Sequence, residues 1–508
     1  MEKTDSADAM ATPIRNPRRW LILVVLCLST LVLVIDNMVL NVAIPQIATD
    51  LGANAQDIQW IIDSYILVFA GLLLTSGSLS DRYGRRSVMI VGLVFFGAAS
   101  VLAAFATTPE LLIAGRVVMG IGGALIMPST LSILITVFDE QERPKAIAAW
   151  SAVAVVGMVG GPVVGGLLLD HFWWGSVFIL NLPIVVLAIL AAVTLMPESK
   201  GPWRKPDLPG MLLSVVGMTA LVWTIIEIPA AGFTAPGTLT ALALAVIALA
   251  GFVIRELSTE DPMVPLELFR NRVFTGSSFS LVLLTFANGG LLLAFTQYLQ
   301  FVLGYTPTKT ALALVPMAVA VLAFNGIGAS LAGKAGNRAI TAVGLAVTAA
   351  GFGVLAMLEV DGGFWLPALA LALMGSGFGL AMPAAIGALM GAVPEQHAGV
   401  GSALNDTIQQ AGGALGVAVL GSILSSGYTD AMPESAPNAS RESIAGALAG
   451  GDGVLAEVAK AAFTSAMSTT FVVSAGAVLA AAALSLVLMR EPRAQQPVAE
   501  PEIATAEF

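Results

Sequence analysis

Residues 77–86 read Gly77-Ser-Leu-Ser-Asp-Arg-Tyr-Gly-Arg-Arg86, a short charged segment between two long apolar runs. The runs cover residues 58–80 and 87–106, and each supplies about the 20 apolar residues that a helix needs to cross a bilayer. Basic residues in a short connection favour its cytoplasmic location. The stretch therefore predicts two membrane-spanning helices joined by a cytoplasmic turn.

The same pattern extends along the whole chain. Of 508 residues, 57% are hydrophobic and 11% are charged, whereas soluble proteins have roughly 25% charged residues. This composition excludes a soluble enzyme, which would need more polar surface. One cysteine, Cys27, and two distant histidines, His171 and His397, predict neither an intramolecular disulfide nor a metal site.

Apolar runs bounded by charges predict an all-α polytopic membrane protein with fourteen spanning helices. We expect them at residues 20–44, 58–80, 87–106, 111–136, 147–169, 176–196, 210–228, 237–254, 274–300, 310–332, 339–358, 366–391, 398–424 and 463–489. With the N-terminus in the cytoplasm, 19 of the 23 Lys and Arg residues fall on the cytoplasmic side, three fall outside, and Arg116 falls within a span. This bias predicts that both termini are cytoplasmic. The expected location is the cell (cytoplasmic) membrane.

Charged, proline-containing linkers divide the spans into groups of six, two and six. The predicted organisation is a tail at 1–19, a six-helix bundle at 20–196, linkers and two extra helices at 197–272, a second bundle at 273–489, and a tail at 490–508. Residues 425–462 form a predicted extracytoplasmic loop with short helical patches, and the C-terminal tail is a predicted disordered segment.

The two six-helix blocks resemble each other in sequence. Gly120-Ile-Gly-Gly-Ala-Leu-Ile-Met-Pro128 matches Gly375-Ser-Gly-Phe-Gly-Leu-Ala-Met-Pro383 at an offset of 255. Leu79-Ser-Asp-Arg-Tyr-Gly84 matches Leu331-Ala-Gly-Lys-Ala-Gly336 at an offset of 252. Duplicated helix blocks are typical of secondary transporters, whose substrates bind between the repeats.

Four motifs resemble the major facilitator superfamily, over residues 20–424 and in the right order. Residues 77–86 resemble its signature loop, and Arg116-Val-Val-Met-Gly-Ile-Gly122 resembles its fourth-span motif. Gly157-Met-Val-Gly-Gly-Pro-Val-Val-Gly-Gly166 resembles the motif of its exporters. Leu33-Val-Ile-Asp-Asn-Met-Val-Leu-Asn-Val-Ala-Ile-Pro45 resembles the first span of the fourteen-span drug:proton antiporter family.

The resemblance implies a transporter, not an enzyme, that exports amphipathic cationic or neutral drugs in exchange for protons. It implies a monomer in the lipid bilayer that takes small-molecule drugs and protons, binds no nucleic acid and uses no cofactor. The implied gating residues are Gly77, Asp81, Arg82, Gly84, Arg85 and Arg86. The implied antiporter-motif residues are Gly157, Gly161, Pro162, Gly165 and Gly166.

The physical reading of two of these motifs is independent of the family. Asp81 can accept hydrogen bonds from a neighbouring helix N-terminus or pair with nearby arginines, forming a latch that opens during transport; the alternative is ordinary topogenic charge. Gly333 occupies the corresponding position in the second repeat, where a latch would be weaker. The span-five glycines permit close helix packing, with generic packing as the alternative.

Charges inside the spans are the candidates for proton coupling, because each costs at least about 2.5–3.5 kcal/mol at the bilayer centre. At 1.5 Å per residue, Asp36, Asp63 and Arg116 share the outer half of the membrane, and Asp406 lies roughly 14 Å from the cytoplasmic end of its span. We expect Asp36 to face the interface between the repeats. A static Asp36–Arg116 pair and a water-facing Asp63 are the alternatives, and Glu227 is predicted to be interfacial.

Polar residues in apolar spans are candidates for substrate binding. They are Asn41, Tyr65, Asn288, Gln297 and Tyr298. Asn288 corresponds to Asp36 at the 252 offset, whereas a Gln-Tyr pair near a span end is also typical of an interfacial anchor. Gly328-Ala-Ser-Leu-Ala-Gly-Lys-Ala335 imitates a phosphate-binding loop but lacks its Ser or Thr and ends an apolar span, so ATP is not the expected energy source.

Three alternatives stay open on sequence alone. An exporter of one endogenous metabolite or antibiotic would share every motif described above. A proton-coupled uptake carrier is disfavoured by the span-five pattern. A membrane enzyme or channel is disfavoured by the ordered repeats and by the lack of a metal or nucleophile cluster in the sequence.

Overall fold

The structure is a computed structural model that describes residues 17–53, 55–201, 207–259, 262–360, 362–449 and 453–489. Throughout this described part, every regular element is a helix. The first block contains α1 (Arg19–Leu51), α2 (Ala55–Tyr83), α3 (Arg85–Ala104), α4 (Pro109–Val137), α5 (Arg143–His171), α6 (Ser176–Ile179) and α7 (Asn181–Leu195). Two further helices follow, α8 (Leu208–Ala231) and α9 (Pro236–Ser258).

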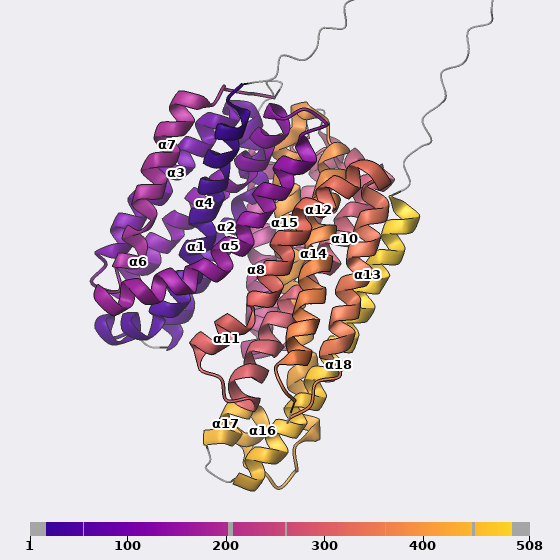
Figure 1. The fold of residues 1–508 in the computed structure, drawn as a ribbon. Helices are drawn as coiled ribbons and strands as arrows, with labels where there is room; N and C mark the ends of the chain where they lie inside the picture. The colour runs from indigo at the N-terminus through magenta and orange to yellow at the C-terminus, as the bar shows by residue number, and fades with distance from the viewer. Residues whose placement is uncertain are drawn as a thin grey trace, which may run out of the picture.

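The second block begins after the 3₁₀ turn Leu266–Arg270 and lies beside the first (Figure 1). It contains α10 (Arg272–Gln297), a π turn (Tyr298–Val302), α11 (Pro307–Ala313), α12 (Val315–Ala335), α13 (Asn337–Leu355), α14 (Trp365–Gly391), the 3₁₀ turn Glu395–His397, α15 (Ala398–Ala431), α16 (Asn438–Glu442), α17 (Ile444–Ala449) and α18 (Gly453–Leu488). The false phosphate loop at 328–335 lies inside α12, which confirms that it is not a strand–loop–helix unit.

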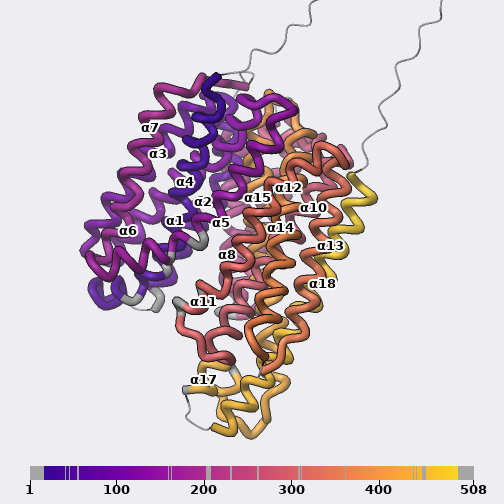
Figure 2. Tube along the Cα trace, viewed as in Figure 1, coloured from indigo at the N-terminus to yellow at the C-terminus, as the bar shows by residue number. Residues whose placement is uncertain are grey.

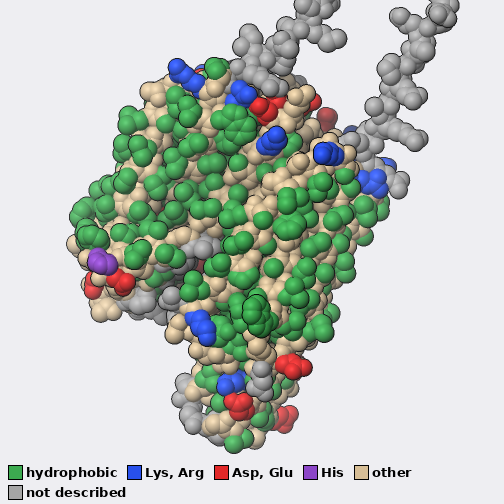
Figure 3. Space-filling model, viewed as in Figure 1, with side chains coloured by type: hydrophobic (Ala, Val, Ile, Leu, Met, Phe, Trp, Pro, Cys, Tyr) green, Lys and Arg blue, Asp and Glu red, His purple; other side chains and the backbone are tan. Residues whose placement is uncertain are grey.

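Thirteen helices in the described part are long and apolar enough to cross a membrane. They overlap thirteen of the fourteen predicted spans, with α6 and α7 together forming one of them. The helix α5 overlaps the remaining span but is not among the thirteen, so the count of fourteen stays a prediction. Hydrophobic side chains cover the flanks of the visible face, and Lys and Arg gather mainly at the end where α1 begins (Figure 3).

The packing of the second block follows that of the first, as the sequence repeat predicts. The helix α1 packs on α5 as α10 packs on α15, and α2 packs on α4 as α12 packs on α14. The helix α3 contacts α4 as α13 contacts α14, and both α4 and α14 carry an internal proline, Pro128 and Pro383. The tube in Figure 2 traces these paths through both blocks. The halves meet through α2 and α4 on α15, and through α12 and α14 on α5.

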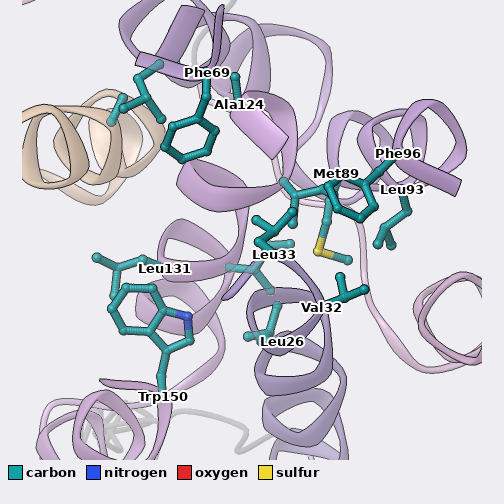
Figure 4. Close-up of a cluster of buried hydrophobic side chains, with 14 of the residues drawn as sticks. Leu26, Val32, Leu33, Phe69, Met89, Leu93, Phe96, Ala124, Leu131 and Trp150 are labelled. Carbon is teal, nitrogen blue, oxygen red and sulfur yellow. The ribbon is translucent and has the colours of Figure 1, made fainter. Parts of the chain in front are cut away.

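Each block has its own apolar core. The first is filled mainly from α1–α7, and Figure 4 shows Leu33, Phe69, Phe96 and Trp150 converging from different helices. The second is filled mainly from α10–α18. The first core continues into Ala403 and its neighbours at the start of α15, so the halves share apolar packing at this end of the molecule.

The predicted loop at 425–462 is more helical than expected. The helix α15 continues to Ala431 and α18 begins at Gly453, so both extend beyond their predicted spans. The Tyr428 hydroxyl donates to the Ser440 carbonyl at 2.7 Å and ties α16 to α15. The sequence pattern missed these extensions because alanine and glycine give no sharp boundary between apolar and polar segments.

The topology can be tested at Ser435, which is exposed between α15 and α16. In a Cys27→Ser background, Ser435→Cys should react in intact cells with a membrane-impermeant maleimide, because this segment is predicted to lie outside. Reaction only after lysis would contradict both the predicted orientation and the span count. A cysteine introduced at Glu140, which is exposed at the opposite end, should label only after lysis and serves as the control.

Candidate functional site

The aspartate of the signature segment joins the two halves at the predicted cytoplasmic end. Asp81, near the end of α2, accepts hydrogen bonds from the backbone N–H groups of Gly399 and Val400 at 2.9 and 3.0 Å. These groups lie in the first turn of α15, where unpaired N–H groups and the helix dipole favour an anion. Arg85 donates to the same carboxylate at 2.7 and 2.9 Å and to the Glu395 carbonyl at 2.8 Å. We call Asp81, Arg85 and the start of α15 the latch.

Two glycines permit this close approach. A Cβ on Gly77 would lie 2.5 Å from the Ala403 side chain, and one on Gly399 would lie 2.4 Å from the Ser80 hydroxyl oxygen. Since real Cβ atoms do not approach so closely, a larger residue at either position would push α2 and α15 apart. Gly77 and Asp81 therefore both hold α2 close to α15, and their role in gating stays a prediction.

The other signature residues shape the turn between α2 and α3. Gly84 has a φ of 115°, which favours glycine. The Arg86 side chain donates to the Met196 carbonyl at 2.8 Å, and its backbone N–H donates to Glu198 at 3.1 Å. The Arg82 guanidinium lies over the Tyr83 ring at 5.0 Å. The linker that follows α7 thus holds this turn.

A buried ion pair occupies the interior of the first block. Arg116 of α4 donates to the Asp36 carboxylate of α1 at 2.6 Å, and their side chains are 0% and 1% exposed. Asn181 of α7 donates to the other carboxylate oxygen at 2.8 Å and also contacts the Ser100 hydroxyl at 3.2 Å. Such a pair is stable in an apolar interior only if its remaining polar atoms are also satisfied.

The expected orientation of Asp36 toward the repeat interface is wrong. Its partners come from α4 and α7 of the same block, and it is absent from the described lining of the cavity between the halves. Asn181 was missed because an asparagine in an apolar run gives no sign of its partner. A polar residue near the start of the sixth predicted span was the one available signal.

Arg116 also fixes α2. Its Nε donates to the Ile61 carbonyl at 3.1 Å, and its guanidinium lies 4.3 Å from the centre of the Tyr65 ring. Tyr65 is 3% exposed and stacks on Phe69. Its prediction as a substrate contact is therefore not supported, because its ring packs against Arg116 in the protein interior. Ile61 and Tyr65 lie on the same helix as Asp81, so α2 connects the ion pair to the latch.

The span-five glycines pack α5 against α1 around Asp36. A Cβ on Gly157, Gly161 or Gly165 would come within 2.6, 2.5 or 2.9 Å of α1 side chains. Gly166 has open space instead, and the Pro162 side chain lies outside the described part. The motif therefore acts through a stripe of three small residues, which permits close helix approach.

A cavity of about 320 Å³ lies between the halves, and we call it the central cavity. Both blocks line it, and the described lining contains amides, hydroxyls and apolar groups without a charged side chain. Trp150 projects from α5 and donates to the Thr30 hydroxyl at 2.9 Å. The lining is formed by Thr30, Val34, Met127, Trp150, Ser151, Ala154, Val155, Thr285, Asn288, Gly289, Val321, Asn325, Phe378, Met382, Ile386, Gln409, Gln410 and Gly413.

The structure separates the predicted substrate residues. Asn288 lines the central cavity, whereas Gln297 lines a different pocket near the α16–α17 segment. Tyr298 is 0% exposed and donates to the Glu359 carbonyl at 2.8 Å, which makes it a structural anchor. Asn41 lies in α1, but its side chain is outside the described part.

Asp406 and Asp63 lie apart from the ion pair. Asp406 of α15 is 3% exposed and accepts from Asn405 at 3.0 Å, while its Oδ2 has no partner within the described residues. It lies one helical turn before Gln409 and Gln410 of the central cavity. Asp63 lines a separate pocket together with Glu227 of α8. The sequence analysis did not predict that these two acids share a pocket.

Comparisons with known proteins agree with this geometry. A family profile described as Major Facilitator Superfamily matches residues 26–417. The tetracenomycin C resistance and export protein of Streptomyces glaucescens is 32% identical, over 96% of this chain and 94% of its own. The multidrug efflux pump LfrA of Mycolicibacterium smegmatis is 34% identical, over 94% of this chain and 97% of its own. The methyl viologen resistance protein SmvA of Salmonella typhimurium is 34% identical, over 81% of this chain and 84% of its own.

The fold is also shared with a solved structure. The human organic anion transporter MFSD10 (TETRAN) matches with a TM-score of 0.58 at 16% identity, over 91% of this chain and 100% of that chain. The family match covers the signature segment, the buried ion pair and the central cavity. The chain therefore belongs to the Major Facilitator Superfamily, and it is a multi-pass membrane transporter rather than an enzyme.

Proposed function

We propose that the protein is a proton-coupled antiporter that exports amphipathic drugs, cationic or neutral, from the cytoplasm. The observation that carries this proposal is the buried Asp36–Arg116 pair, which is linked through α2 to the latch at the opposite end. Relatives whose names describe drug export or resistance support the direction of transport. The proton gradient supplies enough free energy, since one charge crossing 100 mV is worth about 2.3 kcal/mol.

The proposed coupling begins with a proton on Asp36. Protonation removes the charge that Arg116 neutralises, and the arginine is then left buried with weaker partners. Because Arg116 also holds the Ile61 carbonyl and the Tyr65 ring, its movement alters the position of α2. The far end of α2 carries Asp81, so the change reaches the latch and favours opening toward the cytoplasm. Coupling is thus indirect, since Asp36 does not line the central cavity.

Asp406 is a second candidate carboxyl for coupling. Among the described residues its carboxylate accepts from Asn405 alone, and a buried carboxylate with so few partners is a candidate for taking up and releasing a proton during transport. Its position one turn below the central cavity would let a bound substrate affect it. A single acid at this site does not by itself favour doubly charged substrates.

The described lining of the central cavity favours neutral or weakly polar drug surfaces, with amides and hydroxyls for orientation. An exporter of a single metabolite or antibiotic is the second candidate. It is favoured by a relative that is named for resistance to one antibiotic. A transport panel of unrelated drugs in vesicles separates the two, because a narrow exporter would move one compound class only.

Replacing Asp36 with Asn should abolish proton-driven drug uptake into inverted vesicles, to the level of vesicles lacking the protein. Asparagine keeps the size and one acceptor but cannot exchange a proton. Drug–drug exchange at equal pH should continue, because it needs no net proton movement. Transport of a labelled drug, measured in both modes, checks this prediction.

The control for Asp36→Asn is Asp170→Asn, which removes an exposed carboxylate at the end of α5. A purely structural role for Asp36 predicts a different result. The loss of one partner from the buried pair costs about 3–5 kcal/mol in either case, so the transport activity of the folded fraction is what separates the two roles. Well-folded Asp36→Asn protein with intact proton-driven uptake would exclude Asp36 as the coupling residue.

Replacing Asp81 with Asn should weaken the latch, because a neutral amide accepts less strongly than a carboxylate from the α15 N-terminus and Arg85. A cysteine at Ser402, which is 0% exposed here, should then react faster with maleimide, and transport should slow. Drug affinity should change by less than about threefold. That limit corresponds to about 0.7 kcal/mol, since a tenfold change in affinity is worth about 1.4 kcal/mol. Labelling rates in a Cys27→Ser background measure the opening.

Glu140→Gln is the matched control for the latch, since Glu140 is an exposed acid at the same end of the molecule. It should leave both the labelling of Ser402→Cys and the transport rate unchanged. A latch role for Asp81 would be refuted by slow labelling and normal transport in the Asp81→Asn protein.

A further inference from the structure

A pocket of about 290 Å³ lies between α2 and α8, outside the central cavity. It is located near the start of α2 and the end of α8, which is the end of the molecule opposite the latch. The described lining consists of two tryptophans, two carboxylates, one amide and two aliphatic side chains. These residues are Gln59, Trp60, Asp63, Leu67, Trp223, Ile226 and Glu227.

Small residues hold the two helices together below this pocket. A Cβ on Gly71 would lie 2.2 Å from the Thr219 hydroxyl oxygen, so glycine permits direct contact with α8. One further turn along, the hydroxyls of Thr75 and Ser214 lie 3.4 Å apart. Because α8 is one of the two helices between the six-helix blocks, the pocket combines a core helix with an additional one.

Two indole rings form the aromatic part of the pocket. The ring centres of Trp60 and Trp223 are 5.1 Å apart and the ring planes are tilted by 54°, so the rings do not stack flat on each other. Both side chains are only partly buried. Tryptophan faces attract organic cations more strongly than other aromatic side chains do.

The charges in the pocket have one sign. Asp63 and Glu227 are both partly buried, and they line this pocket from α2 and α8. The described lining contains no Lys or Arg that could balance them. Two like charges in a partly dehydrated pocket repel each other, and a bound cation would relieve that repulsion. The described lining of the central cavity, in contrast, has no carboxylate.

We propose that this α2–α8 pocket is a second binding site, specific for aromatic organic cations and distinct from the central cavity. The carboxylates of Asp63 and Glu227 neutralise the cation, and the faces of Trp60 and Trp223 contact its aromatic surface. The inference rests on the proposed function only in taking cationic drugs as substrates. In that setting, the additional helix α8 supplies charge selectivity that the described lining of the central cavity lacks.

Equilibrium binding of ethidium, a fluorescent aromatic cation, to the full-length protein in nanodiscs tests the proposal. Fluorescence polarisation should resolve two sites in the wild-type protein. Glu227→Gln should weaken one of them by about tenfold, which corresponds to 1.4 kcal/mol, and leave the other unchanged. Trp223→Phe should weaken the same site by a smaller factor, since phenylalanine keeps an aromatic face with a weaker attraction for cations.

Matched variants control for loss of charge and of tryptophan elsewhere. Asp430→Asn removes an exposed acid at the end of α15, and Trp365→Phe removes a tryptophan that is 88% exposed at the start of α14. Both should bind ethidium as the wild-type protein does. All variants are compared only as monodisperse protein, and Trp223→Phe provides a conservative second test if Glu227→Gln is unstable.

Wild-type titration curves for both Glu227→Gln and Trp223→Phe would overturn the proposal. Proton-driven ethidium uptake into inverted vesicles is measured in parallel and separates the two claims. Normal uptake with unchanged binding in both variants refutes the pocket alone. Absence of uptake in wild-type vesicles, together with a site lost in Glu227→Gln, refutes the proposed antiport and supports the pocket.

Discussion

The structure depends on one constraint, which is that a charge inside a membrane protein must be neutralised where it lies. Arg116 is fully buried, and Asp36, Asn37 and the Ile61 carbonyl are its hydrogen-bonding partners. Removing one charge would leave the other in an apolar interior at a cost of about 3–5 kcal/mol. The pair therefore ties α1, α2 and α4 into one arrangement for as long as both charges are present.

In the proposed mechanism, the latch responds to this arrangement because α2 is continuous from Ile61 to Asp81. At one end, α2 is held by the arginine, and at the other end its aspartate binds the first turn of α15. The absence of side chains at Gly77 and Gly399 permits α2 and α15 to come this close. A local change of charge can thus favour a different arrangement of two rigid blocks, as a bistable interface permits.

The fold was largely predictable, since length, apolar runs and charge bias constrain helices in a bilayer more strongly than in water. The latch was predictable in part, because an aspartate among three arginines at a span end indicates an ionic contact. The partners of the buried polar groups could not be predicted. Asn181 and Tyr65 lie far along the chain from Asp36 and Arg116, and no periodicity reveals which side chains meet in three dimensions. For the same reason, the sequence did not reveal that Asp63 and Glu227 line one pocket.

Proton exchange is the central claim, and proton movement inside sealed proteoliposomes tests it most directly. With a pH-sensitive dye enclosed and no ATP present, an imposed drug gradient should drive protons in the direction opposite to the drug, and the proton flux should rise with the drug flux. Wild-type protein that moves the drug down its gradient while the internal pH stays constant would contradict the account.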